Sequence, residues 1–129
     1  MKKYIEIFEV GPRDGLQSER KVIGTEDKVK LVNFLSKCGM AKIEVSSFVS
    51  PKWVPQLADA DIVFKTITRY PTVKYTALTP NLKGLNDAIA AKANEVAIFA
   101  AASETFSKKN INCSIEESIN RFKPLMVEA

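Results

Sequence analysis

An arginine and an aspartate stand side by side, as Arg13 and Asp14, in the stretch EVGPRDGLQ near the start of the chain. They follow a run of β-forming residues and are flanked by Gly11, Pro12 and Gly15, which are typical of turns. An aspartate at the tip of a strand is a hard oxygen ligand suited to Mg²⁺ or Mn²⁺. The adjacent guanidinium offers fixed donors to a carbonyl oxygen that becomes an enolate. From position alone, an ordinary turn with a surface ion pair is an equal alternative.

Polar residues also follow the three later segments that have the character of strands. They are Glu44 to Ser47 at the end of the second segment, Thr79 to Asn81 after the third, and Ser103, Glu104 and Lys108 to Asn110 after the fourth. In parallel α/β barrels the working residues lie at the C-terminal ends of the strands. We therefore expect these side chains to converge on one rim.

The elements that would position these residues alternate along the chain. β-rich segments fall at residues 4–10, 41–48, 73–79 and 95–101. Apolar residues at helical spacing follow each segment: Leu31, Phe34, Leu35 and Cys38; Ala60, Val63, Phe64 and Ile67; Leu82, Leu85 and Ile89; Ile115, Ile119 and Phe122. The pattern predicts four strands, each followed by a helix.

Capping and breaking residues predict several helix ends. The expected boundary residues are Thr25 and Gly39 for the first helix, Asn81 for the third, and the S-x-x-E capping box of Ser114 and Glu117 for the last. Pro124 falls inside that last helix, where it has no N–H to donate and its ring clashes with the preceding turn. We expect the helix to kink there or to end early.

Four β-α units in series imply an α/β fold with parallel strands and right-handed crossovers. The commonest closed form of this series, the TIM (β/α)₈ barrel, has eight units in about 250 residues. The 129 residues supply four units, so residues 1–129 are expected to be the N-terminal half of a single TIM-barrel domain. Such a half-barrel has two unpaired edge strands, which natural proteins avoid exposing.

Composition excludes several classes of function. The chain is 46% hydrophobic and 26% charged, with a net charge of +4 and no basic run beyond pairs, which favours an anionic small molecule over nucleic acid. No apolar run is long enough to span a bilayer, so no membrane partner is expected. The two cysteines form no disulfide framework and indicate a reducing compartment. With no histidine, the chain cannot offer imidazole to a metal.

Four stretches together resemble the 3-hydroxy-3-methylglutaryl-CoA lyase family, which belongs to the metal-dependent lyase and Claisen-condensing TIM barrels. They are EVGPRDGLQ, IEVSSFVSPKWVPQLAD, LTPNLKG and AASETFSKKNINCSIEES. The first stretch is similar to the whole superfamily, whereas SFVSPKWVPQ and SKKNINCSIEES resemble the lyases in particular. The resemblance covers essentially all 129 residues, but about the first half of a family member.

The resemblance implies a role for each matching residue. Arg13 would stabilise the enolate oxygen, Glu44 would assist proton transfer, and Asp14 would ligate a divalent metal, Mg²⁺ or Mn²⁺. The expected substrate contacts are Ser47 at the acyl portion, Gln17 in the same pocket, and Lys109 and Asn110 near coenzyme A. Plainer alternatives remain: Glu44 as an ion-pair partner of Arg13, Ser47 as a backbone hydrogen-bonding residue, and the lysines as a solvated loop.

The implied reaction is the retro-Claisen cleavage of HMG-CoA to acetyl-CoA and acetoacetate, a step of leucine degradation and ketone-body metabolism. Members of this family complete the metal site with a His-x-His pair and supply a proton from a cysteine in a Gly-rich loop. Neither has a counterpart here, because Cys38 and Cys113 stand in different surroundings. We therefore expect an incomplete metal site and no lyase activity from these 129 residues alone.

Two other interpretations stay open. A condensing synthase of the isopropylmalate or homocitrate type shares the early Arg-Asp pair, although SFVSPKWVPQ argues against it. A non-catalytic half-barrel could instead pair with itself, as a homo-oligomer such as a dimer, or with a separate C-terminal half. The first strand is expected to start close to Met1, which leaves no room for a transit peptide and favours a bacterial-type cytoplasmic protein.

Overall fold

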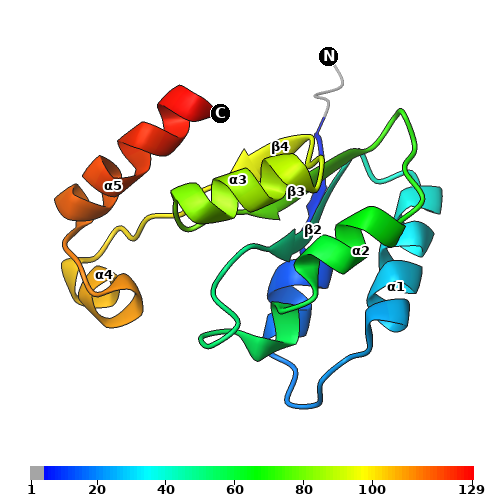
Figure 1. The fold of residues 1–129 in the computed structure, drawn as a ribbon, viewed down its shortest axis with the longest axis horizontal. Coiled ribbons are helices and arrows are strands. Elements are labelled where there is room, and N and C mark those ends of the chain that lie inside the picture. The colour runs from blue at the N-terminus through cyan, green and yellow to red at the C-terminus, as the bar shows by residue number, and fades with distance from the viewer. Residues whose placement is uncertain (1–4) are drawn as a thin grey trace.

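Four parallel strands form one sheet in the order β1-β2-β3-β4 in the computed structural model, which describes residues 5–129. The strands are β1 (Phe8–Glu9), β2 (Lys42–Ser47), β3 (Lys74–Leu78) and β4 (Glu95–Ala97). They are connected by α1 (Thr25–Lys37), α2 (Ala60–Thr66) and α3 (Leu82–Ala90), shown in Figure 1. The predicted succession of strands and helices is confirmed.

The two edge strands are shorter than the sequence predicts. β1 begins at Phe8 rather than near residue 4, and the side chains of Ile5 and Ile7 are exposed. Tyr4, the first residue of the expected strand, lies outside the described residues. β4 ends at Ala97 although β-forming residues continue beyond it. Each of these strands has one neighbour in the sheet, so ladder hydrogen bonds extend less far than in β2 and β3.

The main core lies between one face of the sheet and the three connecting helices. Its buried members include Val32 of α1, Phe64 of α2, Ala88 of α3, and Ile43 and Tyr75 of the sheet. The predicted apolar face of α2 is confirmed, since all four residues that define it are buried.

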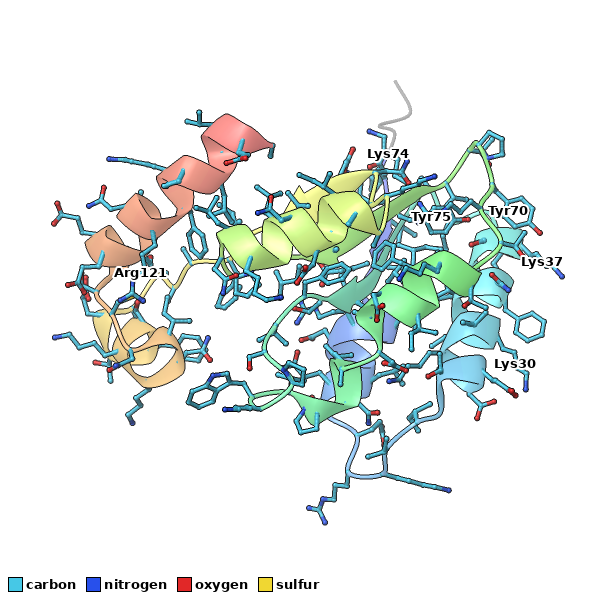
Figure 2. The ribbon with its side chains drawn as sticks, in the orientation of Figure 1. Lys30, Lys37, Tyr70, Lys74, Tyr75 and Arg121 are labelled. Carbon is cyan, nitrogen blue, oxygen red and sulfur yellow. The ribbon has the colours of Figure 1, made fainter. Side chains whose placement is uncertain are left out.

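The predicted buried face of α1 is wrong in part. Leu35 packs against the main core, but Phe34 and Cys38 are exposed, and the fully buried residues of the helix are Lys28, Val29, Val32 and Ser36. Polar residues can occupy this face because they find partners there: the Ser36 hydroxyl lies 3.0 Å from the hydroxyl of Tyr75. Figure 2 shows Tyr75 with Tyr70 near the C-terminal end of α1.

Most predicted helix ends are confirmed. Asn81 caps α3 by accepting a hydrogen bond from the Gly84 N–H at 2.9 Å, and Gly39 follows α1 with φ +80°. The N-cap of α1 is Gly24 rather than Thr25, whose hydroxyl donates to Asp59 instead.

The C-terminal segment forms two helices, α4 (Glu104–Ile111) and α5 (Ile115–Glu128), which lie together at one end of the molecule in Figure 1. α4 was not predicted. The capping box of α5 is confirmed, since Ser114 and Glu117 each accept a hydrogen bond from the other's backbone N–H. The expectation that α5 ends early at Pro124 is wrong, because the helix continues to Glu128. Within residues 5–129, no helix combines the length and apolar character needed to cross a bilayer.

Candidate functional site

Arg13 and Asp14 lie in η1 (Gly11–Gly15), a short π-helix that directly follows β1. The Val10 carbonyl accepts hydrogen bonds from the N–H groups of Arg13 at 3.1 Å and Asp14 at 2.8 Å. The Glu9 carboxylate fixes the entry to this turn by accepting the Gly11 N–H at 2.7 Å. The sequence predicts a turn here, and the structure forms a single short π-helix at that place, a form often found at functional sites.

The central contact of the site joins Arg13 to Glu44 of β2. Arg13 donates from Nε to Oε1 of Glu44, whose side chain is 3% exposed, while 17% of the arginine side chain is exposed. A carboxylate this deeply buried requires a cationic partner, because an unpaired buried charge is strongly destabilising. Glu44 therefore holds the guanidinium in a defined plane at the C-terminal edge of the sheet.

The second nitrogen of the guanidinium contacts the other two predicted residues of the motif. Nη1 of Arg13 donates to Oδ1 of Asp14 at 3.0 Å and lies 3.5 Å from Oε1 of Gln17. Within residues 5–129, Nη2 donates no hydrogen bond. The structure thus brings four predicted site residues together and leaves the Nη2 amino group of the guanidinium without a hydrogen bond to residues 5–129.

Asp14 is well exposed, with 64% of its side chain accessible to solvent. Its carboxylate can be reached by a cation, but the described residues contain no group of three or more His, Cys, Asp or Glu that could hold a metal ion. Divalent cations such as Mg²⁺ need several oxygen ligands in a fixed geometry. Asp14 can therefore serve as one ligand of such a site, and residues 5–129 do not form the site by themselves.

A β-bulge places Glu44 and Ser47 on the same face of the sheet. In a regular strand, residues three apart point to opposite faces. Here Glu44 pairs with Thr76 and Ser47 pairs with Leu78, with a register shift between Glu44 and Ser46. Since Thr76 and Leu78 are two residues apart on β3, they share a face, and so do their partners. The sequence offers no signal for this bulge.

From the sequence, Ser47 could either contact substrate or simply form a hydrogen bond with the backbone, and the structure shows such a backbone hydrogen bond. Its hydroxyl donates to the Leu78 carbonyl at 3.2 Å. The residue also borders a cavity of about 490 Å³ formed by the loop after β2, α2 and α3. Four charged residues of that cavity form two ion pairs within their own helices: Asp61 with Lys65, and Lys83 with Asp87. The charges that line the cavity therefore cancel in pairs. The cavity lies on the side of the sheet that the helices cover.

Lys109 and Asn110 are not brought to this cluster. Both are exposed residues of α4, at the end of the molecule away from η1 in Figure 1. Within residues 5–129, no hydrogen bond or ion pair links either of them to Arg13 or Glu44. The lysines lie on a helix rather than in the solvated loop considered from sequence.

Sequence reasoning missed the residues that support the cluster. Thr76 lies opposite Glu44 on β3 and is 2% exposed. Gln56 and Lys28, discussed below, are buried polar residues whose partners are distant in sequence. Hydropathy patterns assign such residues to the surface, and although Gln56 lies within the stretch SFVSPKWVPQ, nothing in that stretch indicates its buried contacts.

Parallel β-α units in series, with polar side chains such as Arg13 and Asp14 directly after a strand, are typical of the TIM-barrel class of enzymes. The chain belongs to the HMGL-like family, whose profile matches residues 4–129. The predicted fold class and the resemblance are both confirmed.

Similar proteins of known name are HMG-CoA lyases. The chain is 57% identical over 127 residues to the mitochondrial hydroxymethylglutaryl-CoA lyase of Pongo abelii and 56% identical to the cytoplasmic 3-hydroxy-3-methylglutaryl-CoA lyase of Mus musculus. These alignments cover 98% of this chain but 39% and 37% of the relatives. The chain thus spans about two fifths of the length of the curated relatives it matches.

The similar solved structures are also of HMG-CoA lyases. The lyase of Pseudomonas aeruginosa superimposes with a TM-score of 0.94 at 54% identity, covering 97% of this chain and 42% of that one. A lyase of Acinetobacter baumannii, described in complex with coenzyme A and 3-methylmalate, superimposes with a TM-score of 0.91 at 41% identity, covering 95% of this chain and 40% of that one. The four β-α units therefore correspond to part of the barrel of HMG-CoA lyases.

Proposed function

We propose that this chain is the N-terminal half of a hydroxymethylglutaryl-CoA lyase barrel, in which it supplies part of the site that cleaves HMG-CoA to acetyl-CoA and acetoacetate. The observation that carries the proposal is the contact between Arg13 and the buried Glu44, because it fixes a cation at the strand ends. The identity of about 56% to named lyases supports the choice of reaction.

Arg13 is proposed to stabilise the negative charge that develops in the reaction. Loss of the proton from the tertiary hydroxyl of HMG-CoA lets the carbon–carbon bond break, and its electron pair passes to the thioester as an enolate. The enolate carbon is then protonated to give acetyl-CoA, and the former carbinol becomes the ketone of acetoacetate. Nη2 of Arg13 could donate to the enolate oxygen while Nε stays bonded to Glu44.

Glu44 is proposed to have two roles in the same cleavage reaction. Its buried carboxylate orients Arg13, and from behind the guanidinium it would assist the movement of a proton at the reacting centre. Ser47, on the same face of the sheet, is proposed to contact the acyl portion of the substrate, and Gln17 to line the same pocket. Lys109 and Asn110 are proposed to contact coenzyme A on the exposed surface of α4.

Metal dependence is a general property of this family. Asp14 would provide one carboxylate ligand, and the remaining ligands would come from outside residues 5–129. A bound divalent cation, Mg²⁺ or Mn²⁺, would lower the pKa of the substrate hydroxyl. We also propose an acyl-CoA substrate, a dimeric or other homo-oligomeric assembly, and a cytoplasmic setting like that of the relatives named cytoplasmic.

A hybrid enzyme tests this function. Residues 1–129 would replace the matching part of the Pseudomonas aeruginosa lyase, which they resemble at 54% identity. The hybrid is expected to release acetoacetate from HMG-CoA and to be inactive with acetyl-CoA and 2-oxo acids. A hybrid that is folded, as judged by circular dichroism, but inactive on HMG-CoA would refute the proposal. Condensation with a 2-oxo acid would instead favour the synthase interpretation.

The 129-residue chain by itself is expected to release no acetoacetate. Solution mass measurement then separates the two remaining interpretations. A stable dimer would support assembly of half-barrels, whereas an aggregating or molten monomer would indicate that the sheet edges at β1 and β4 require further strands. Acetoacetate release at rates near those of complete lyases would contradict the expectation.

A further inference from the structure

Gln56 is a buried glutamine that holds a neighbouring loop by three hydrogen bonds. It lies in η2 (Pro55–Leu57), after β2, and is 6% exposed. Its Oε1 accepts the Ile23 N–H at 2.9 Å, and its Nε2 donates to the carbonyls of Lys21 at 2.9 Å and Glu19 at 3.4 Å. One side-chain amide thus satisfies three backbone groups of the segment 19–23.

Two charged residues hold Gln56 itself in place. Lys28 of α1, 5% exposed, donates from Nζ to the Gln56 carbonyl and to Oδ1 of Asp59 at 2.7 Å. The other carboxylate oxygen of Asp59 accepts the Thr25 hydroxyl at 2.6 Å. Every polar group of this cluster has a partner, and the described residues contain no buried side-chain N or O atom without one. Fully satisfied buried networks of this kind favour a single arrangement.

The network connects the two loops that carry the candidate site. The segment 19–23 begins two residues after Gln17 and continues the loop that starts with Arg13 and Asp14. Gln56 lies in the loop that follows Glu44 and Ser47 of β2. Besides the Arg13–Glu44 pair, the side chain of Gln56 therefore ties the first loop to the second within the described residues.

We infer that Gln56, anchored by Lys28 and Asp59, is a positioning residue that sets the geometry of Arg13 against Glu44. The inference rests on the proposed lyase function. η1 is held at its entry by the Glu9 carboxylate, and the loop that continues from it is held at residues 19–23 by Gln56, so side chains rather than the sheet fix this segment on both sides of Arg13. Loss of the Gln56 contacts would leave the fold intact but let the loop, and with it the guanidinium, shift.

The test compares Gln56→Met with a matched control, Asn94→Ala. Methionine keeps the volume of Gln56 but makes none of its three hydrogen bonds. Asn94 also accepts a backbone N–H, that of Tyr75 at 2.9 Å, but at the start of β4, at the opposite end of the sheet from the site. Gln56→Glu is the second variant, since its carboxylate can still accept the Ile23 N–H but cannot donate to the two carbonyls.

Two measurements separate the positioning role from the proposed function. In the folded hybrid, active or not, hydrogen exchange of the Ile23 amide is expected to accelerate at least about tenfold in Gln56→Met and to stay unchanged in Asn94→Ala. In the hybrid enzyme, Gln56→Met is expected to lower kcat by about ten- to a hundredfold with KM within about twofold, because small misplacements of reacting groups are costly. Asn94→Ala should leave kcat near that of the parent hybrid.

Different results would overturn the proposed lyase function and the positioning role of Gln56. An inactive parent hybrid refutes the proposed lyase function, while the exchange measurement still tests whether Gln56 holds the first loop. Unchanged exchange at Ile23, or an active hybrid whose kcat is insensitive to both Gln56 substitutions, overturns the inference. Equal losses of kcat in Gln56→Met and Asn94→Ala at equal losses of Tm overturn it as well, since a general loss of stability would then suffice. If Gln56→Met does not fold, Gln56→Glu decides by the same kcat criterion.

Discussion

Arg13 and Glu44, thirty-one residues apart, form an ion pair that joins η1 to β2, and only the arginine reaches solvent. The pair therefore has an inner member that cannot contact a substrate freely and an outer member that can. A buried carboxylate that fixes an accessible guanidinium is suited to stabilise an anion at one defined position. Stability and catalysis should both depend on this contact, and they can be measured separately.

Glu44→Gln tests the contribution of the pair to stability. The amide keeps the shape of the side chain and can still accept a hydrogen bond, but it removes the negative charge beside Arg13. We expect the free energy of unfolding to fall by about 1–3 kcal/mol, measured by urea denaturation. Asp61→Asn is the control, because it breaks the exposed pair with Lys65 and should cost less than about 0.5 kcal/mol. Equal effects of the two substitutions would contradict this account of the buried pair.

Gly84→Ala tests the close approach of α3 to the loop after β2. A Cβ at this position would lie 2.8 Å from the Phe48 carbonyl oxygen and 3.1 Å from Cδ of Pro80. Alanine normally stabilises a helix relative to glycine by about 1 kcal/mol, so the expected loss of about 1–3 kcal/mol reverses the usual sign. Gly24→Ala, where no atom lies within 4 Å of the new Cβ, is the control for steric strain; because Gly24 is the N-cap of α1, we expect it to lose only the N-cap preference of glycine over alanine, below about 1 kcal/mol. A stabilised Gly84→Ala variant would show that the loop yields without strain.

Glu95 makes stability depend on pH in the acid range. Hydrogen bonds from Lys42 and Lys74 hold the pKa of its carboxyl below the usual value of 4.5. Because the folded pKa is lowered, this stabilisation is present above pH 4.5 and is lost as the pH falls through the folded pKa. Over that interval the unfolded chain binds more protons, so stability rises with pH.

We expect Glu95→Gln to weaken the dependence of stability on pH in this acid range. The measurement is the free energy of unfolding of both proteins between neutral pH and the acid limit of folding. The difference between parent and variant should shrink as the pH falls below 4.5. A difference that stays constant with pH would mean that the two lysines do not lower the pKa of Glu95.

The fold and the centre of the site could be predicted because they depend on local pattern and on topology. β-rich segments alternate with helical periodicity, and parallel strands bring their C-terminal ends to one edge. Arg13 follows β1 and Glu44 lies within the neighbouring strand β2, so their meeting follows from the order of the strands. The same reasoning gives the capping residues Asn81 and Ser114, whose signals lie within one turn of the helix.

The features that could not be predicted depend on partners distant in sequence. Lys28 lies on the buried face of α1 because Asp59 neutralises it, which a hydropathy pattern of that helix cannot show. Ser47 shares a face with Glu44 because of a bulge that no residue type in the strand indicates. α4 is an exception: it is a polar helix without an apolar stripe, although its N-cap Ser103, which accepts the Phe106 N–H at 3.3 Å, is a local signal.

The most direct test of the central claim is the kcat of the Arg13→Lys variant of the hybrid enzyme with HMG-CoA. Lysine keeps the positive charge but cannot donate to Glu44 from one nitrogen and to an enolate oxygen from another in the fixed plane of a guanidinium. We predict that kcat falls by about a hundred- to a thousandfold. Arg20→Lys, an exposed substitution in the same loop, should have no effect. A kcat for Arg13→Lys within about twofold of the parent hybrid would contradict the claim that this guanidinium stabilises the transition state.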